Sequence, residues 1–144
     1  MDIVDDGQCF ACGARNPGGL HMRFRLDASR ACAAAEIAVP PRFAGWGNTV
    51  HGGIVATLLD EAMVYACGAT GQYVATATMD LRFRKPVPIE TPLRIEGRVT
   101  GRRARFLQAE SLVLLDDAVL ARARGVLAIM RAITDADPLE TGRS

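Results

Sequence analysis

Apolar and polar residues alternate along much of this chain, in the pattern that is typical of half-buried β-strands. The alternation is strictest over residues 74–85, where every second residue from Ala75 to Phe83 is apolar and Thr76 lies on the opposite, polar side. Less regular alternation predicts further strands at residues 20–26, 31–39, 93–99, 103–115 and 118–131. The turns between the last three strands are expected at Gly101 and at Asp116-Asp117.

A different pattern occupies residues 54–67, which are apolar almost all round and contain neither Pro nor Gly. Ala, Leu and Met favour helix, and Gly68 is a natural C-terminal stop. A helix that is apolar on every face is expected to be buried on every face. We therefore expect this helix at the centre of the domain.

The order of elements, β-β-α-β-β-β-β, predicts the α+β class, with a curled, mainly antiparallel sheet wrapped around one long central helix. The domain is expected over residues 20–131. Residues 1–19 form an irregular lead-in punctuated by Gly and Pro, and residues 132–144 form a polar tail. A single sheet over one helix leaves strand edges exposed, which favours pairing between subunits.

Length and charge narrow the function classes. The 144 residues suit one domain, and 17 Lys and Arg against 16 Asp and Glu give a net charge of +1. This balance disfavours a protein that coats nucleic acid or an anionic membrane. No apolar run reaches the ~18 residues that span a bilayer, and the acidic N-terminus does not resemble a secretory signal. We expect a cytoplasmic protein without nucleic-acid or membrane partners, whose cysteines are thiols.

Two adjacent carboxylates interrupt the apolar helix. Asp60 and Glu61 are its only acidic residues, and a buried carboxylate is costly unless it has a partner or a task. Asp60 follows Gly53 by seven residues and so lies on nearly the same helix face, while the helix start offers free backbone N–H groups. An activating amide and a carboxylate on one helix suit acyl transfer to water. Alternatively, either carboxylate forms an ion pair with an arginine of the sheet, such as Arg82 or Arg84.

The segment HGGIVATLLDEA, residues 51–62, followed by an alternating strand that ends in Lys-Pro, resembles the hotdog-fold acyl-CoA thioesterases. The closest subgroup is the one typified by phenylacetyl-CoA thioesterase. The lead-in CFACGARNPGGLHMRF also resembles the start of many bacterial members, so the resemblance covers residues 9–131. It implies a hotdog fold, a homodimer whose sheets join edge to edge or a homotetramer of two such dimers, and active sites at the subunit interface.

The family's catalytic roles are carried over from their places in this motif. Asp60 matches the helix carboxylate that acts as nucleophile or general base. Gly52 matches the residue whose N–H polarises the thioester carbonyl. His51 matches the motif histidine, which shapes the loop and contacts the thioester or the departing thiol. Thr76 matches a hydroxyl that orients water or the carboxylate.

Further substrate contacts are expected near the helix start. Gly45 stands where several members of the family have Asn or Gln close to the thioester, and Asn48 is the candidate to substitute for it. Gly53 lets a ligand carbonyl approach the backbone closely. Glu61, next to Asp60, is a further candidate for a substrate contact.

Five arginines cluster around one predicted hairpin: Arg94, Arg98, Arg102, Arg103 and Arg105. Guanidinium groups bind phosphates bidentately, so the cluster suits the phosphates of coenzyme A. We assign that contact to Arg102, Arg103 and Arg105. The alternative is an ordinary solvated strand face.

Cys9 and Cys12 form a single Cys-x-x-Cys pair. A structural zinc site needs four ligands, and the chain has no second Cys-x-x-Cys and no His-x-x-x-His. His21 or Cys32 could contribute, but we expect no metal. A thioredoxin-like role is disfavoured because no βαβ pattern surrounds the pair.

These observations predict a thioesterase that hydrolyses an acyl- or aryl-acyl-CoA to the free acid and CoA, with no cofactor. The alternative is a non-catalytic protein of the same fold that binds acyl-CoA or another acyl ligand. A hotdog hydratase or dehydratase is disfavoured because the His-Phe-Pro loop of those enzymes is absent.

Overall fold

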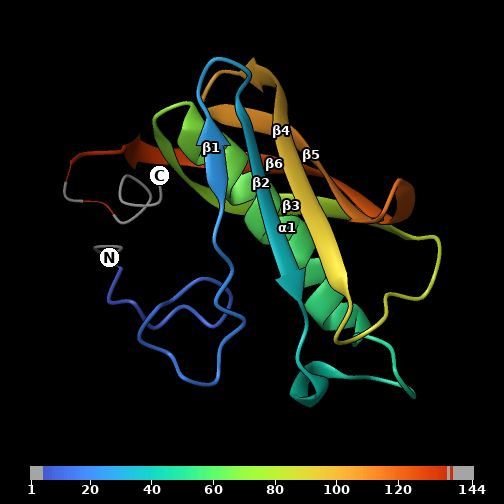
Figure 1. The fold of residues 1–144 in the computed structure, drawn as a ribbon. Helices are drawn as coiled ribbons and strands as arrows, with labels where there is room; N and C mark the ends of the chain where they lie inside the picture. The colour runs from blue at the N-terminus through green and yellow to red at the C-terminus, as the bar shows by residue number, and fades with distance from the viewer. Residues whose placement is uncertain (1–4, 136, 138–144) are drawn as a thin grey trace.

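The computed structural model describes residues 5–135 and residue 137. Within them the chain forms one α-helix, a 3-10 turn and six strands (Figure 1). The helix α1 spans Gly52–Ala69, and the 3-10 turn η1 spans Pro41–Phe43. The strands are β1 (Arg25–Asp27), β2 (Cys32–Ala38), β3 (Gln72–Phe83), β4 (Pro92–Arg103), β5 (Phe106–Leu115) and β6 (Ala118–Ala132).

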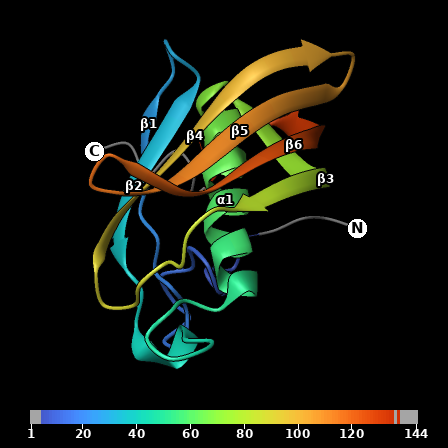
Figure 2. The ribbon, with the colours of Figure 1, turned by 90° about the vertical axis from the view of Figure 1, so that its right-hand side faces the viewer.

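All six strands belong to one antiparallel sheet, in the order β1-β2-β4-β5-β6-β3. The sheet curls around α1, which crosses its concave face (Figure 2). Side chains between helix and sheet form the core, and the most deeply buried include Leu58, Leu59 and Met63 of α1 and Ile95 and Leu127 of the sheet. The predicted α+β architecture and the order of its elements are confirmed.

The helix is not buried all round, contrary to the expectation from its composition. The sheet covers one face, whereas the opposite face is only half-buried and carries Ile54, Thr57, Asp60, Glu61 and Val64. By length and composition alone α1 could cross a membrane, but half of it is buried inside the domain, as is usual for a core helix. A single chain therefore leaves apolar side chains and a carboxylate of α1 open on one side.

The outer strand β3 lies beside this open face of α1. It is 12 residues long, and most of its residues from Ala75 onward are exposed. A long strand at the edge of a sheet presents unpaired backbone N–H and C=O groups that can pair with another chain. The open edge that the sequence led us to expect is therefore this strand.

The prediction for residues 20–26 was correct about burial and wrong about pairing. Leu20, Met22 and Phe24 are at most 5% exposed, yet only Arg25–Asp27 pairs with β2. The residues before them bond to the lead-in instead, because the Met22 N–H donates to the Ala11 carbonyl at 2.9 Å. The alternation of apolar and polar residues over 20–26 therefore reflects an irregular segment that packs one face on the core.

The turn predicted at Gly101 lies further along the chain. β4 continues through Gly101 to Arg103, with a register shift between Val99 and Gly101. The turn falls at Ala104, whose φ of 53° is in the left-handed region. Glycine at a bulge and glycine at a turn give the same sequence signal, which is why the position was misplaced.

Gly97 of β4 brings the sheet into direct contact with the helix backbone. A Cβ atom at this position would lie 2.1 Å from the carbonyl oxygen of Ala62. Because that oxygen belongs to the rigid helix, the structure can make room only by moving α1 away from the sheet. Gly97 therefore sets how closely α1 packs on the strands that support it.

Gly97→Ala is expected to destabilise the domain by about 3 kcal/mol, the upper end of what overpacking usually costs, because the added Cβ meets a fixed backbone oxygen. For a chain of this size that corresponds to a fall in Tm of roughly 10 °C in a thermal unfolding experiment followed by circular dichroism. Gly101→Ala is the matched control in the same strand, since its nearest neighbour is the movable amide end of Gln108. Equal Tm values for the two variants would contradict this account of the packing.

Candidate active site

His51 prepares the start of α1. It is the N-cap residue, and its Nδ1 accepts a hydrogen bond from the Gly53 N–H at 2.9 Å. Since Nδ1 accepts this bond, the proton of the neutral imidazole is on Nε2 of a ring that is exposed. The His51 carbonyl accepts from Ile54 and Val55. The cap thus fixes the ring and satisfies three of the first N–H groups of the helix.

The Gly52 N–H remains available. Gly52 is an exposed residue, and no partner for its N–H occurs among the described residues. It sits at the positive end of the α1 dipole, where backbone N–H groups attract developing negative charge. Gly53, in contrast, donates to His51, and a Cβ at Gly53 would press on the His51 ring at 3.2 Å. The structure therefore presents Gly52, not Gly53, as the free donor.

Asp60 lies on the half-buried face of α1 and is held by β3. The Thr76 hydroxyl donates to Asp60 Oδ1 at 2.6 Å. Strict alternation would have placed Thr76 on the polar side of the strand, but a register shift between Thr76 and Thr78 changes the facing of the residues. Thr76 pairs with the fully buried Leu127, so both face the helix. The bulge is what brings the hydroxyl to the carboxylate.

Neither helix carboxylate forms the ion pair that was considered as an alternative. Arg82 lies near Asp80 of its own strand, at 3.6 Å between Nε and Oδ1. Among residues 5–135 and 137, no ion pair joins an arginine or lysine to Asp60 or Glu61. Asp60 is therefore oriented by a neutral hydroxyl, and its second oxygen has no hydrogen bond or ion pair within the described chain.

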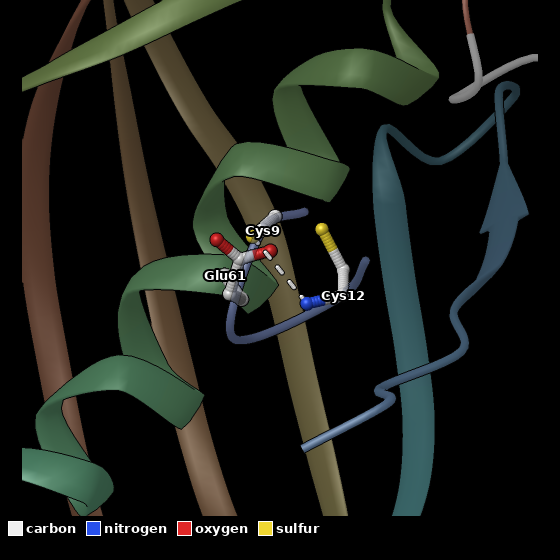
Figure 3. Close-up of side chains that lie close together, drawn as sticks. All are labelled: Cys9, Cys12 and Glu61. Atoms are coloured by element: carbon white, nitrogen blue, oxygen red, sulfur yellow. Dashed lines mark hydrogen bonds between the residues drawn. The ribbon is translucent and has the colours of Figure 1, made fainter. Parts of the chain in front are cut away.

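Glu61 points away from this site, toward the lead-in. Its carboxylate lies beside the thiols of Cys9 and Cys12 (Figure 3). Burial raises the pKa of Glu61 to about 7, the hydrogen bond from Cys12 opposes the rise, and the charge of Asp60 adds to it. Burial and the Glu61 charge likewise raise the pKa of the Cys12 thiol above its usual range. The two adjacent carboxylates thus have different surroundings.

Gly52 and Asp60 share one helix but are not close. Asp60 is eight positions after Gly52, which at a rise of 1.5 Å per residue is about 12 Å along the axis. A thioester carbonyl bound to the Gly52 N–H would lie beyond the reach of the Asp60 carboxylate of the same chain. The sequence placed both groups on related faces of the helix without taking this axial separation into account.

The loop before α1 contains Gly45 and Asn48, the residues compared above with the family's thioester contact. Asn48 is exposed, and its carbonyl accepts from the Ile89 N–H at 3.0 Å. Gly45 packs on the cap residue, because a Cβ there would lie 3.1 Å from the Cα of His51. Phe83 is 57% exposed, and its ring edge lies 4.0 Å from where a Gly52 Cβ would be. Sequence reasoning missed Phe83 because its strand position indicated core.

The arginine cluster divides into two groups. Arg94 is paired with Glu96 and Arg98 with Glu110, as expected for a solvated strand face. Arg102, Arg103 and Arg105 lie exposed at the β4–β5 turn. Figures 1 and 2 show this turn at the end of the sheet opposite to the start of α1. Within one chain, these three arginines and Gly52 are therefore at opposite ends.

The family model of the thioesterase superfamily matches residues 47–121, just over half of the chain. The chain belongs to the thioesterase superfamily. The matched segment contains the cap, α1 and the strands β3 to β5. A comparison of this chain with curated proteins found no match.

Solved structures show the same fold. PaaI from the phenylacetic acid degradation operon of E. coli has a TM-score of 0.66 at 18% identity, over 72% of this chain and 75% of that one. A phenylacetic acid degradation-related protein from Ralstonia eutropha has a TM-score of 0.70 at 20% identity, over 76% and 86%. A Streptococcus mutans protein bound to acetyl CoA has a TM-score of 0.72 at 16% identity, over 78% and 91%. The predicted hotdog fold is thereby confirmed, and the similarity to PaaI is a similarity of fold.

Proposed function

We propose that this thioesterase superfamily member hydrolyses the thioester of an acyl- or aryl-acyl-CoA to the free acid and CoA. The observation that carries the proposal is that α1 presents two groups suited to acyl transfer. The Gly52 N–H is a free donor at the positive end of the helix, and Asp60 is a carboxylate held by Thr76 without a cationic partner in the described chain. Acyl transfer needs a donor for the oxyanion and a base or nucleophile.

Two copies of the chain are needed to assemble this site. The groups lie about 12 Å apart along one helix, so the Gly52 N–H of one subunit would act with the Asp60 of its partner subunit. The half-buried face of α1 and the open edge of β3 support a second copy at this place. In a two-fold symmetric pair each interface contact occurs twice, which gives two equivalent sites per dimer.

The reaction then follows from the roles of these groups. The thioester carbonyl oxygen accepts from the Gly52 N–H, which stabilises the negative charge that forms when the carbonyl carbon is attacked. Asp60 either removes a proton from the attacking water or attacks the carbon itself to form an anhydride, which water then opens. The C–S bond breaks, and the CoA thiolate takes up a proton. That proton comes from water or, in the general-base route, from the Asp60 carboxyl that took it from the attacking water. The Nε2–H of His51, on an exposed ring at the helix start, can donate a hydrogen bond to the departing thiolate.

A substrate panel tests this function. The purified full-length protein is assayed with short, long and aromatic acyl-CoAs, measuring free thiol release by absorbance and binding by calorimetry. Turnover of at least one acyl-CoA, well above the rate without protein, is the expected result. Binding without turnover across the panel would overturn the proposal in favour of a non-catalytic acyl-CoA binding protein.

The exposed arginines at the β4–β5 turn are proposed to bind the CoA phosphates from the partner subunit. Arg102 already donates to the Ala104 carbonyl, and Arg105 stacks on Phe106. Arg103 has no such contact among the described residues, so Arg103→Ala is expected to have the largest effect. KM should rise about 2- to 5-fold with kcat nearly unchanged, because an exposed ion pair contributes up to about 1 kcal/mol and holds ground and transition states alike.

Two comparisons decide whether this effect is specific. Arg98→Ala is the control, because Arg98 is paired with Glu110 on the sheet. A short thioester that lacks the nucleotide should be hydrolysed equally well by wild type and Arg103→Ala. An equal loss on both substrates would show that Arg103 supports the fold, and no loss on either would leave it as a solvated strand residue.

A further inference from the structure

The folded chain brings the two cysteines of the lead-in and one carboxylate of α1 to a single point. One ligand atom from each of Cys9, Cys12 and Glu61, the two Sγ atoms and a carboxylate oxygen, lie within 4.8 Å of one another. Figure 3 shows the loop that carries the cysteines lying against α1 at Glu61. We propose that these three side chains bind one zinc ion, which joins the lead-in to the catalytic helix.

The backbone between the cysteines already has the form of a metal-binding loop. The Cys12 N–H donates to Cys9 Sγ at 3.4 Å, and the Gly13 N–H donates to the Cys9 carbonyl at 2.7 Å. Hydrogen bonds of this kind orient a ligand and stabilise its charged form. A Cβ at Gly13 would lie 2.4 Å from the Gly7 carbonyl oxygen and 2.5 Å from the Cys9 nitrogen. The loop therefore closes this tightly only with glycine at position 13.

The loop is also fixed to the domain. The Phe10 carbonyl accepts from the Leu20 N–H at 2.7 Å, and the Ala11 carbonyl accepts from the Met22 N–H at 2.9 Å. Ala11 itself is 1% exposed. The residues between the two cysteines are thus held by the core, so an ion that binds the thiols has little chain to order. Preorganisation of this kind favours binding.

The cavity beside these three side chains is also lined by Asp5, Asp6 and Tyr65, and none of the residues that line it is basic. Grouped thiolates and a carboxylate without a basic partner are costly to bury unless they are protonated or a metal ion compensates their charge. The cluster provides three ligands, so a water molecule would be the fourth ligand of a tetrahedral site.

The ligand types select zinc. Thiolates favour Zn²⁺ over Mg²⁺ or Ca²⁺, and Zn²⁺ takes four ligands in a tetrahedron. Bonds of about 2.0 to 2.3 Å place ligand atoms about 3.5 to 3.8 Å apart, so small side-chain rotations close the present arrangement. Binding releases the two thiol protons to solvent while Glu61 binds as the carboxylate. The ion would fix the lead-in on α1 beside Asp60 and so stabilise the helix that carries the site.

The two residues first considered as extra ligands have other contacts. His21 Nε2 is hydrogen-bonded to the Asn16 carbonyl at 2.5 Å, and the Cys32 thiol donates to the Arg30 carbonyl at 3.1 Å. Glu61 could not be found by spacing, because it comes from the helix, far along the chain from the Cys-x-x-Cys pair. Cys32 is therefore a suitable control residue.

The test uses full-length protein purified without a metal-affinity tag. Metal content is measured by mass spectrometry, and Co²⁺ is titrated into the metal-free protein while its absorbance is recorded. We expect about one zinc per chain, and with one equivalent of Co²⁺ the charge-transfer and tetrahedral d–d bands of a thiolate site. Cys12→Ser should abolish these bands, Glu61→Gln should weaken Co²⁺ binding at least ~10-fold, and Cys32→Ser should leave both unchanged.

A stability measurement provides an independent readout. Removing zinc with a chelator should lower the Tm of the wild type, and adding zinc back should restore it. The Cys12→Ser variant should not respond to either treatment. The proposal is overturned if the reduced wild type binds neither zinc nor Co²⁺ stoichiometrically, or if Cys32→Ser loses binding as Cys12→Ser does. It is equally overturned if Cys9 and Cys12 are joined by a disulfide in protein prepared under reducing conditions.

Discussion

Asp60→Asn is expected to lower kcat at least ~100-fold, the usual scale for loss of a general base or nucleophile. Asn keeps the shape of the side chain and can still accept the hydrogen bond from Thr76. It removes the negative charge that takes a proton from water or attacks the carbonyl. The variant should therefore fold and bind substrate, with nearly unchanged KM, and lose turnover. Steady-state kinetics on the best acyl-CoA of the panel provide the measurement.

Comparison with the neighbouring carboxylate makes this result specific. Glu61→Gln should cost much less in kcat than Asp60→Asn, because Glu61 faces the two cysteines and not the open face of α1. Glu36→Gln, an exposed substitution in β2, serves as the control for loss of a charge elsewhere. If Glu61→Gln is the more damaging of the two helix substitutions, the assignment of the catalytic carboxylate is wrong.

Gly52→Pro is expected to lower kcat by about 100- to 1000-fold, as the loss of one oxyanion donor does. Proline has no N–H, so the substitution removes the single donor that the account assigns to the carbonyl oxygen. Proline is well tolerated at the first position of a helix, which Gly52 occupies. The preceding residue, His51, already has the extended ψ of 137° that proline requires of its neighbour.

The control at this position is Gly52→Ala, which adds a methyl group and keeps the N–H. Its Cβ would meet only Phe83, at 4.0 Å, so little should change in folding. Activity of Gly52→Ala should stay much closer to wild type than that of Gly52→Pro. If alanine and proline reduce kcat equally, the effect is due to the side chain and the Gly52 N–H is not the oxyanion donor.

The fold could be predicted from the sequence because most segments show one clear pattern of apolar residues, either that of a strand or that of a helix. Alternation identified the long strands β4 to β6, and the apolar run with its Gly68 end located α1. The errors occurred where irregular backbone interrupts a period. The Ala77 bulge reversed the facing of Thr76, and the bulge before Gly101 was taken for a turn. Bulges insert one residue without a clear sequence signal.

The candidate site was predictable residue by residue but not in its arrangement. The motif gave His51, Gly52 and Asp60, and the structure shows the cap, the free N–H and the carboxylate held by Thr76. The pattern of one chain does not contain the distance between these groups, which is what leads us to propose that a second copy completes the site. Glu61 illustrates the same limit, because its neighbours come from the lead-in.

The central claim is that each site combines Gly52 of one subunit with Asp60 of the partner subunit. Co-expression of Gly52→Pro and Asp60→Asn chains in equal amounts tests it directly. In randomly assembled oligomers, roughly one quarter of the sites would receive an intact Gly52 from one chain and an intact Asp60 from the other. The account predicts activity near one quarter of wild type, far above either variant alone. Activity no higher than that of the separate variants would contradict it.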